Sequence, residues 1–290
     1  MTQVRQIDKI DKIYKSQLGD SEFRVLSKFI YNELGIKMPD VKKVMLQSRL
    51  QRRLNDLKKN SFSEYIDFVF SREGKDEMIN MLDIVTTNKT DFFREPVHFD
   101  FLTQKMLPDY LARLQRPTLK LWSAGCSSGE EPYTLAMVLS EYRQSQSKEF
   151  DFRITGTDIS TRMLVRASTA IYPEDRISDI SNTLRSKYLL RSKNRQNCTV
   201  RIVPELRSKV KFYKVNFMDR DYPGRDQFDI IFCRNVLIYF DRKTQEEVIN
   251  RLCTRLKPGG YFFLGHSESI TNFNVPLTQV QSTIFIKKNR

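Results

Sequence analysis

Strands and helices alternate along the second part of the chain, and this alternation restricts the fold more than any other feature of the sequence. Short β-type runs end in polar or glycine-rich turns, and helical segments follow most of them. The predicted strands are Leu119–Ala124, Phe152–Thr157, Lys209–Val215, Phe228–Cys233 and Tyr261–Leu264. Predicted helices begin near Glu130, Ser160 and Lys243. This order predicts an α/β fold with a doubly wound sheet.

Two stretches depart from simple alternation. At about residues 170–209, the β-like pieces Lys187–Arg191 and Thr199–Val203 flank the polar residues Ser192–Asn197, which predicts a small antiparallel insertion. The segment Lys257–Gly260 is expected to be a turn before the fifth strand. A terminal hairpin is predicted from Leu277–Val280 and Thr283–Lys287.

The first part of the chain has a helical pattern. Apolar residues recur at intervals of three and four before Gly35, which is expected to end the first helix. Further helices are predicted from Pro39 to Leu57, over Phe62–Phe70 and over Lys75–Val85. Ser61 and Glu64 have the spacing of a capping box at the third of these helices.

The resulting organisation has four parts. Residues 1–20 are expected to be a leader, residues 21–85 a small helical domain, and residues 86–98 a linker rich in polar and aromatic side chains. A helix over Phe99–Leu114 then opens the α/β domain, which extends over 99–290.

Composition limits the partners and the cellular setting. Forty-nine Lys and Arg against 35 Asp and Glu give a net charge of +14, which predicts an acidic partner: nucleic acid, an anionic membrane surface or an acidic protein. The four cysteines form no CxxC pair, and the chain has only two histidines, His98 and His266, so we expect reduced thiols and no metal site. No apolar run approaches the roughly 20 residues that span a bilayer, and the N-terminus lacks a secretory signal. A soluble cytoplasmic protein is expected.

The first turn of the sheet and the end of the second strand predict a nucleoside pocket. The turn Gly125–Gly129 presents backbone N–H groups to a ligand, although it lacks the GxGxxG spacing. Asp158, at the end of the second strand, is placed to accept hydrogen bonds from both ribose hydroxyls of an adenosine. An acid at a strand end is often only a helix cap, so the prediction depends on both features together.

The same turn also satisfies the G-x-S-x-G pattern of a hydrolase nucleophile, with Ser127 as the nucleophile and His266 available for a triad. Hydrolases reach this turn after several strands, whereas here it follows the first strand of the sheet. No oxyanion segment of the HGGG type precedes it. The topology therefore disfavours a hydrolase.

Five separated motifs carry a family resemblance: Asn88–Glu95, Trp122–Tyr133, Thr157–Ile159, Phe232–Phe240 and Gly265–Glu268. In order and spacing the chain closely resembles the chemotaxis receptor methyltransferases from about Phe23 to Ile286. These enzymes methylate glutamates on the cytoplasmic helices of chemoreceptors. The resemblance implies a Rossmann-like methyltransferase sheet with a small antiparallel β-subdomain of three strands, preceded by an all-helical receptor-binding domain and a linker that contributes to the cofactor site. It also implies S-adenosyl-L-methionine as cofactor and S-adenosyl-L-homocysteine as product.

The resemblance also assigns roles to individual residues. It places Asn88, Thr90 and Arg94 against the cofactor, with Arg94 near the carboxylate of the cofactor or near the reacting centre. Glu131, in preference to Glu130, would contact the cofactor, and Tyr239 would lie close to the methyl group. The remaining predicted cofactor residues are Asp158 at the ribose, and Asn216, Phe217, Arg234 and Asn235 at the adenine and methionine parts.

A glutamate side chain, with an unperturbed pKa of about 4.3, is already a carboxylate nucleophile at neutral pH. No general base is then required. We expect direct displacement at the sulfonium, with the protein positioning the reactants and excluding water. Arg94 is expected to orient the incoming carboxylate.

The second helix suggests how the receptor is held. It carries seven basic residues and one acid between Lys42 and Lys59. At about 100° per residue, its leucines cluster on one side and its cations on a neighbouring arc, which predicts a cationic surface for acidic receptor helices. The predicted substrate-binding residues are Lys42, Arg49, Arg52, Arg53 and Lys59.

The sequence leaves two alternative functions open and indicates which binding partners to expect. A nucleic-acid methyltransferase would also be basic, although Arg234–Val236 occupies the place where an NPPY-type motif would stand. A non-catalytic scaffold that senses the cofactor is a third reading. In some relatives the β-subdomain binds a receptor C-terminal peptide by strand addition, but Ser192–Asn197 contains no glycine, which puts this in doubt. We expect a monomer that is recruited to membrane receptor clusters, with no nucleic acid bound and no membrane insertion.

Overall fold

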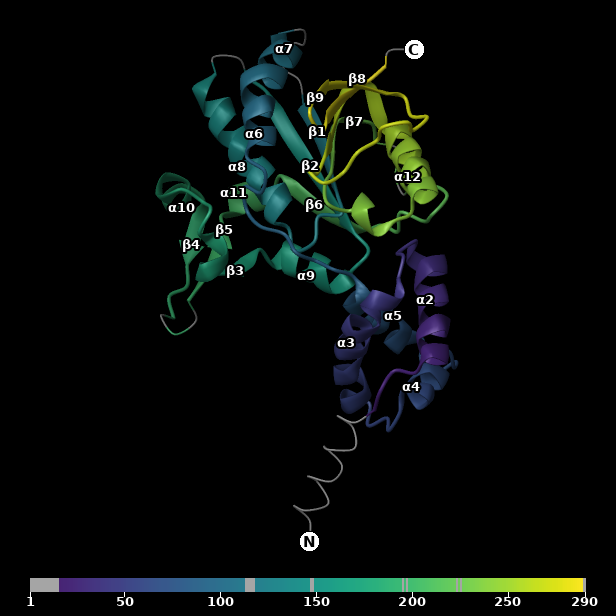
Figure 1. Ribbon diagram of the computed structural model, residues 1–290. Coiled ribbons are helices and arrows are strands. Elements are labelled where there is room, and N and C mark those ends of the chain that lie inside the picture. The colour runs from purple at the N-terminus through teal and green to yellow at the C-terminus, as the bar shows by residue number, and fades with distance from the viewer. Residues whose placement is uncertain are drawn as a thin grey trace. The chain divides into compact units, whose positions relative to one another are not determined.

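The computed structural model describes residues 16–112, 118–146, 149–194, 196, 198–222, 224 and 226–288. Within these residues the chain forms two compact units (Figure 1). One unit contains residues 16–87 together with Tyr239–Asp241, and the other contains the rest of the described chain. The expected leader lies outside the described residues as far as residue 15. Among the described residues, no helix is long and apolar enough to cross a membrane.

The first unit is all helical. Its elements are α2 (Asp20–Leu34), η1 (Asp40–Lys42), α3 (Lys43–Asp56), α4 (Phe62–Val69) and α5 (Lys75–Val85). The side chains buried from α2 and α3 are Phe23, Leu26, Ile30, Leu34, Leu46, Leu50 and Leu54, at the predicted intervals of three and four. Gly35, with a φ of 67°, ends α2 in the left-handed conformation. Ser61 accepts the N–H of Glu64 at 3.1 Å and so caps α4, as predicted.

The second unit is built on a seven-stranded sheet in the order β6-β2-β1-β7-β8-β10-β9. Its strands are β1 (Thr118–Ala124), β2 (Asp151–Asp158), β6 (Val210–Lys214), β7 (Phe228–Cys233), β8 (Leu256–Leu264), β9 (Leu277–Gln281) and β10 (Ile284–Lys287). The strands from β6 to β8 are parallel, and the terminal hairpin is antiparallel. This confirms the predicted doubly wound α/β fold.

The order of strands reverses direction beside β1, because β2 and β6 lie on one side of it and β7 and β8 on the other (Figure 1). In open α/β sheets such a reversal creates a crevice at the carboxyl ends of the strands. The helices that connect these strands are α8 (Glu130–Ser145), α9 (Thr161–Thr169) and α12 (Arg242–Thr254). Stacked rings of Phe232 and Phe263, 4.3 Å apart, join β7 to β8 in the core.

The helix expected over 99–114 has three parts: α6 (Val97–Phe101), the π-helical η2 (Leu102–Met106) and α7 (Leu107–Ala112). Residues 113 and 114 lie outside the described residues. The hydroxyl of Thr103 donates to the carbonyls of Phe99 and Asp100 at 3.0 and 3.3 Å. This side-chain donor competes for the carbonyl that an α-helical N–H would use, in keeping with the local π geometry.

The insertion is a three-stranded sheet in the order β3-β5-β4, as the family resemblance implies, although the residue pattern alone indicated only two of its strands. Its elements are β3 (Ile171–Pro173), η3 (Glu174–Ile177), α10 (Asn182–Tyr188), β4 (Leu189–Arg191), β5 (Thr199–Ile202) and α11 (Pro204–Arg207). Ser181 caps α10 by accepting the N–H of Leu184, so Lys187 and Tyr188 are helical and not part of a strand. The expected turn Lys257–Gly260 is instead a bulged part of β8, where the register with β7 shifts.

Candidate functional site

The turn between β1 and α8 is fixed to the end of β2 by backbone hydrogen bonds. The N–H groups of Gly125 and Cys126 both donate to the carbonyl of Thr157 at 2.8 Å. Gly125 has a φ of 83°, and a Cβ added to it would lie 2.4 Å from a methyl group of Val236. A left-handed backbone with no room for a side chain requires glycine at this position. The tight turn therefore presents its backbone to the crevice, as the sequence predicts.

Asp158 connects this turn to the start of α9. One carboxylate oxygen accepts the N–H of Ser127 at 2.8 Å, and the other accepts the N–H of Ser160 at 2.9 Å. The side chain is 8% exposed, so it is held at the carboxyl end of β2 in a defined orientation. Carboxylates keep spare acceptor capacity after two such bonds, so the predicted contact with ribose hydroxyls is chemically available.

The linker folds against the same turn. The hydroxyl of Ser127 donates to the carbonyl of Asn88 at 3.0 Å, and the N–H of Phe93 donates to the hydroxyl of Thr134 at 3.2 Å. The Ser127 hydroxyl is therefore bonded to the linker, and the described residues show no hydrogen bond between Ser127 and His266, the pair that the hydrolase alternative required. Phe93 and Glu95 adopt positive φ values of 52° and 57°. Two such conformations outside glycine are typical of segments that are held in place for function.

Arg234, directly after β7, joins the linker to α8. Its guanidinium donates to the Glu95 carboxylate at 3.0 and 3.3 Å, to Glu131 at 3.1 Å, and to the carbonyl of Arg94. The side chain is 2% exposed and lies 5.6 Å from the ring centre of Phe99. A buried guanidinium bound by two carboxylates fixes the strand end, the linker and the helix in one arrangement.

The two carboxylates give this cluster an excess of one negative charge over the Arg234 guanidinium. Burial opposes ionisation of Glu95, but the guanidinium and the N–H of His266 lower the pKa of this carboxyl below its ordinary value. Glu95 is therefore ionised at neutral pH. The site is suited to a ligand that carries positive charge.

The two glutamates at the start of α8 have different surroundings. Glu131 accepts the hydroxyl of Ser123 at 2.7 Å as well as Arg234, and so belongs to the buried cluster. Glu130 is 2% exposed and accepts the hydroxyl of Ser128 at 2.7 Å, with Arg176 at 3.4 Å. Burial raises the pKa of Glu130 above its ordinary value, against these bonds. Each glutamate shares a donor with the linker: Glu131 shares Arg234 with Glu95, and Glu130 shares Arg176 with the carbonyl of Thr90.

The other predicted cofactor residues lie at the linker and at the strand ends. The side chain of Arg94 is partly exposed and donates to the carbonyl of Lys89 at 3.2 Å. The amide oxygen of Asn216, just beyond β6, accepts the N–H of Met218 at 3.0 Å. The remaining positions are Thr90, partly exposed in the linker, Phe217, 7% exposed after β6, and Asn235, with a φ of 59° after β7.

Glu268 is a site residue to which the sequence reasoning gave no role. Its carboxylate accepts four backbone N–H groups at 2.7–2.9 Å, which belong to Asn235, Val236, Leu237 and Gly265. Burial raises the pKa of this carboxyl, although the four bonds oppose the shift. Glu268 therefore holds the segment after β7 in the shape that aims Arg234 and Asn235. The motif Gly265–Glu268 was the only sequence signal for it.

Both histidines of the chain lie beside Glu95. His98 Nδ1 is 3.5 Å and His266 Nε2 is 4.0 Å from the same carboxylate oxygen, and His98 Nε2 is 2.9 Å from the hydroxyl of Thr283. Burial, aided by the Arg234 charge, lowers the pKa of His98 to about 4. Because Arg234 already neutralises the oxygen that the histidines face, we assign no metal ion to this cluster.

In the helical unit, four of the five predicted substrate-binding cations have hydrogen-bond partners or ring contacts, and three of these are Arg49, Arg53 and Lys59. The guanidinium of Arg49 donates to the carbonyls of Val85 and Thr86 at 2.6 and 3.0 Å, at the end of α5. Arg53 is paired with the buried Glu77, which raises the pKa of the guanidinium further. The ammonium of Lys59 lies 4.6 Å from the ring centre of Phe68.

The remaining cations of this set are Lys42, 5.8 Å from the ring centre of Tyr239, and Arg52. Arg52 is exposed and has no ion pair in the described part of the chain. It shares the outer face of α3 with Ser48 and with Val44, which is 77% exposed. Tyr239 groups with the helical unit, and its carbonyl accepts the N–H of Lys37 at 3.0 Å.

Comparisons with known proteins address both units. A family model described as "CheR methyltransferase, SAM binding domain" matches residues 88–286, and one described as "CheR methyltransferase, all-alpha domain" matches residues 21–86. A "Chemotaxis protein methyltransferase" from Borreliella burgdorferi is 42% identical over 252 residues, which cover 86% of this chain and 88% of that protein. The protein of the same name from Escherichia coli is 34% identical over 92% of this chain and 91% of its own length. "Chemotaxis protein methyltransferase 2" from Pseudomonas aeruginosa is 36% identical over 91% of this chain and 92% of its own length.

Proposed function

Since the chain belongs to the CheR methyltransferase family, we propose that it transfers the methyl group of S-adenosylmethionine to glutamate carboxylates on the cytoplasmic helices of chemoreceptors. The observation that carries this proposal is the buried cluster of Arg234, Glu95 and Glu131 beside the glycine turn and Asp158. It gathers acidic groups at the switch point of the sheet, where a cationic nucleoside fits.

The residues present fit the cofactor in shape and in charge. Gly125 allows the turn to pack tightly against Val236 with its backbone in the left-handed conformation, and Asp158 offers acceptor capacity for the ribose. We propose that Glu131 and the linker residues Asn88 and Thr90 hold the methionine part. Asn216, Phe217 and Asn235 would complete the adenine and methionine contacts from the strand ends.

When bound, S-adenosylmethionine supplies an electrophilic methyl group on a sulfonium. The chain has to hold a receptor glutamate, ionised at neutral pH, in line with that group and to exclude water. We propose that Arg94 orients the carboxylate from the linker and that Arg234, through the carbonyl of Arg94, positions it. Tyr239, five residues after Arg234 in the chain, is proposed to line the methyl group. No general base is required.

A labelled methyl-transfer assay with receptor membranes tests the activity. Base-labile label in receptor protein is the expected result, and Arg94→Ala should lower turnover by about 100-fold or more, the scale of a lost positioning group. Lys89→Ala, an exposed cation of the same linker whose backbone carbonyl stays in place, is the matched control and should remain active. Base-stable label in nucleic acid would replace the proposal by a nucleic-acid methyltransferase. Cofactor binding without transfer of label to any acceptor would indicate a non-catalytic scaffold that senses the cofactor.

For receptor docking we propose the cationic face of the helical unit: Lys42, Arg49, Arg52, Arg53 and Lys59. Since Arg49 and Arg53 also tie α3 to α5, reversing their charge would disturb the unit itself. The exposed Arg52 gives the cleaner test. Arg52→Glu should lower kcat/KM for receptor by about tenfold, because an attractive charge becomes repulsive, and leave the cofactor Kd unchanged. Arg72→Glu, at another exposed site of the same unit, is the control.

A second receptor contact is proposed at the β-subdomain, where strands β3 and β4 form the two edges of the small sheet. Strand addition at such an edge can bind an extended peptide. The absence of glycine from the loop 192–197 argues for weak binding at most; residues 195 and 197 lie outside the described residues. Pull-down of receptor fragments with and without their last few residues decides this. Gel filtration of the protein alone tests whether it is a monomer. Gel filtration of the protein mixed with receptor fragments tests whether it is recruited to receptors.

A further inference from the structure

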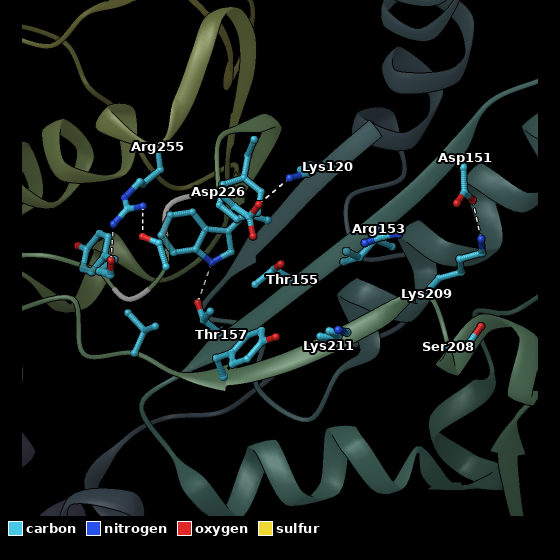
Figure 2. A pocket seen from close by; sticks show the side chains of 17 residues that line it. Lys120, Asp151, Arg153, Thr155, Thr157, Ser208, Lys209, Lys211, Asp226 and Arg255 are labelled. Carbon is cyan, nitrogen blue, oxygen red and sulfur yellow. Dashed lines mark hydrogen bonds and ion pairs between the residues drawn. The ribbon is translucent and has the colours of Figure 1, made fainter. Parts of the chain in front are cut away.

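One face of the strands β2 and β6 is largely uncovered, whereas the neighbouring part of β1 is covered at Trp122 by Tyr222 and Phe228. The helices that pack on β2 and β6 are α8, α9 and α11, and right-handed crossovers place α8 and α9 on the same face of the sheet. The connection from β6 to β7 crosses the other face, and its described residues form no helix. Parallel strands are normally covered on both faces. Here a groove of about 630 Å³ lies on the open face (Figure 2).

The groove is lined by a row of cations. Lys120 on β1 is the register partner of Arg153 on β2, and Lys211 on β6, the register partner of Thr155, lies two residues further along (Figure 2). Two of the lysines that line the groove already pair with carboxylates: Lys120 with Asp226 at 2.6 Å, and Lys209 with Asp151. Arg153 and Lys211 are exposed and have no ion pair in the part of the chain that the structure describes. Like charges on neighbouring strands cost stability, so this row favours an anionic ligand.

Aromatic side chains line the groove two residues further along the strands. Tyr213, on β6, is 50% exposed and is the register partner of Thr157 on β2. The hydroxyl of Thr157 accepts the indole N–H of Trp122, a buried side chain of β1, at 2.9 Å. Two residues of a strand span about 6.6 Å, the scale of the distance between a base and its phosphate. The hydroxyl of Thr155, which also lines the groove, adds a neutral hydrogen-bonding group beside Lys211, its register partner on β6.

We propose that this groove binds a nucleoside phosphate, with Arg153 and Lys211 on the phosphate and the Tyr213 ring against the base. Arg and Lys bind phosphate oxygens by charge-assisted hydrogen bonds, and exposed tyrosine rings stack on bases. The site is separate from methyl transfer and does not depend on it. Thr157 and Val215 line the groove one residue before Asp158 and Asn216, so the ligand contacts the strands that carry the proposed cofactor residues.

Trp122 is the only tryptophan of the chain, so its fluorescence reports directly on the groove. The full-length protein, first saturated with S-adenosylhomocysteine, is titrated with adenosine and guanosine triphosphates. A saturable fluorescence change is expected for at least one of them. Lys211→Ala and Arg153→Ala should each weaken binding by about tenfold or more, as expected for the loss of a charge-assisted bond.

Lys214→Ala is the matched control, because Lys214 is an exposed lysine of the same strand on the opposite face, and its loss should change nothing. Asp158→Ala removes a proposed cofactor contact and should leave nucleotide binding intact, which separates failure of the groove from failure of the proposed function. Equal binding of inorganic triphosphate would overturn the nucleoside assignment. Binding of a glutamate-rich peptide in place of nucleotides, or no response to either, would overturn the proposal as a whole.

Discussion

At the scale of single residues, the guanidinium of Arg234 joins three parts of the second unit. All three of its nitrogens donate, to Glu95, to Glu131 and to the carbonyl of Arg94. Lysine has the same charge but one nitrogen, and it cannot reach these acceptors together. Arg234→Lys should therefore lower the free energy of unfolding by about 2–3 kcal/mol, because at least one buried carboxylate loses its donor.

Urea denaturation measures this change. Arg242→Lys is the control, since the Arg242 guanidinium is exposed and donates to a single carbonyl, that of Thr271. Its effect should stay within about 0.5 kcal/mol. Equal stability of the two variants would mean that the cluster does not hold the linker.

His98 makes the stability of the protein dependent on pH. Its pKa falls from 6.5 to about 4 in the folded protein because the ring is buried, with Arg234 nearby. Between these values the unfolded chain binds a proton that the folded protein does not bind, so stability falls as the pH drops from 6.5 through about 4. The loss should reach about 2 kcal/mol at about pH 5.

Unfolding free energies measured at about pH 7.5 and about pH 5 test this prediction. His98→Gln, which can still bond Thr283, should remove most of the difference. His266→Gln changes a ring that is 54% exposed and should keep the difference. The same pH slope in all three proteins would show that other groups cause it.

At the scale of elements, the turn between β1 and α8 depends on two properties of Gly125, its positive φ and the 2.4 Å approach to Val236. Gly125→Ala should weaken cofactor binding by about tenfold or more, because both properties oppose a side chain. Adding Val236→Ala should restore part of the affinity, since it removes the contact and leaves the backbone cost. Calorimetry with S-adenosylhomocysteine measures both variants.

Substitution of Gly224 measures, in the same experiment, the cost of a left-handed backbone conformation without a steric clash. It has a φ of 87°, and a Cβ there would meet nothing within 4 Å. Gly224→Ala should lower stability by about 1–2 kcal/mol, the cost of a left-handed non-glycine residue, and leave cofactor affinity unchanged. If Gly125→Ala behaved in the same way, contact with Val236 would have no part in the site.

The main elements could be predicted because their apolar positions repeat with the period of a helix or alternate as in a strand. The missed elements depend on local contacts that leave little pattern. Strand β3 has only three residues and includes Pro173, and it exists because β5 pairs with it. Helix α10 depends on the Ser181 cap, so Tyr188, a residue typical of strands, is helical. The bulge in β8 results from its register with β7.

The candidate site was predictable to a similar extent. The positions at strand ends, such as Asp158 and Arg234, follow from the topology of a parallel sheet. Glu95 and Glu268 could not be assigned a role in this way, since their partners are a guanidinium 139 residues away and backbone N–H groups. Such contacts exist only once the sheet and linker have folded. The sequence marks these residues by motif and gives no chemistry for them.

At the scale of the whole molecule, the excess of positive charge is unevenly distributed along the chain. Residues 88–290 hold 33 Lys and Arg against 22 Asp and Glu, a net charge of +11, whereas residues 1–87 hold 16 against 13, a net charge of +3. The helical domain, with its predicted cationic face, therefore supplies little of the total. Any long-range attraction of an acidic receptor arises mainly from the methyltransferase part.

This distribution predicts how methylation responds to salt. Raising the ionic strength from about 0.05 to about 0.5 M shortens the range of electrostatic attraction severalfold, so kcat/KM for receptor should fall by about tenfold or more. Cofactor affinity, measured by calorimetry in the same buffers, should change much less, because the charged side chains of Asp158 and Arg234 in the proposed cofactor site are buried and therefore weakly screened. Arg52→Glu should lower kcat/KM at every salt concentration and keep most of the slope, since the net charge of +11 in residues 88–290 is unaffected. A slope that disappears in this variant would assign the attraction to α3 alone, and a rate independent of salt would leave the basic surface without a part in receptor encounter.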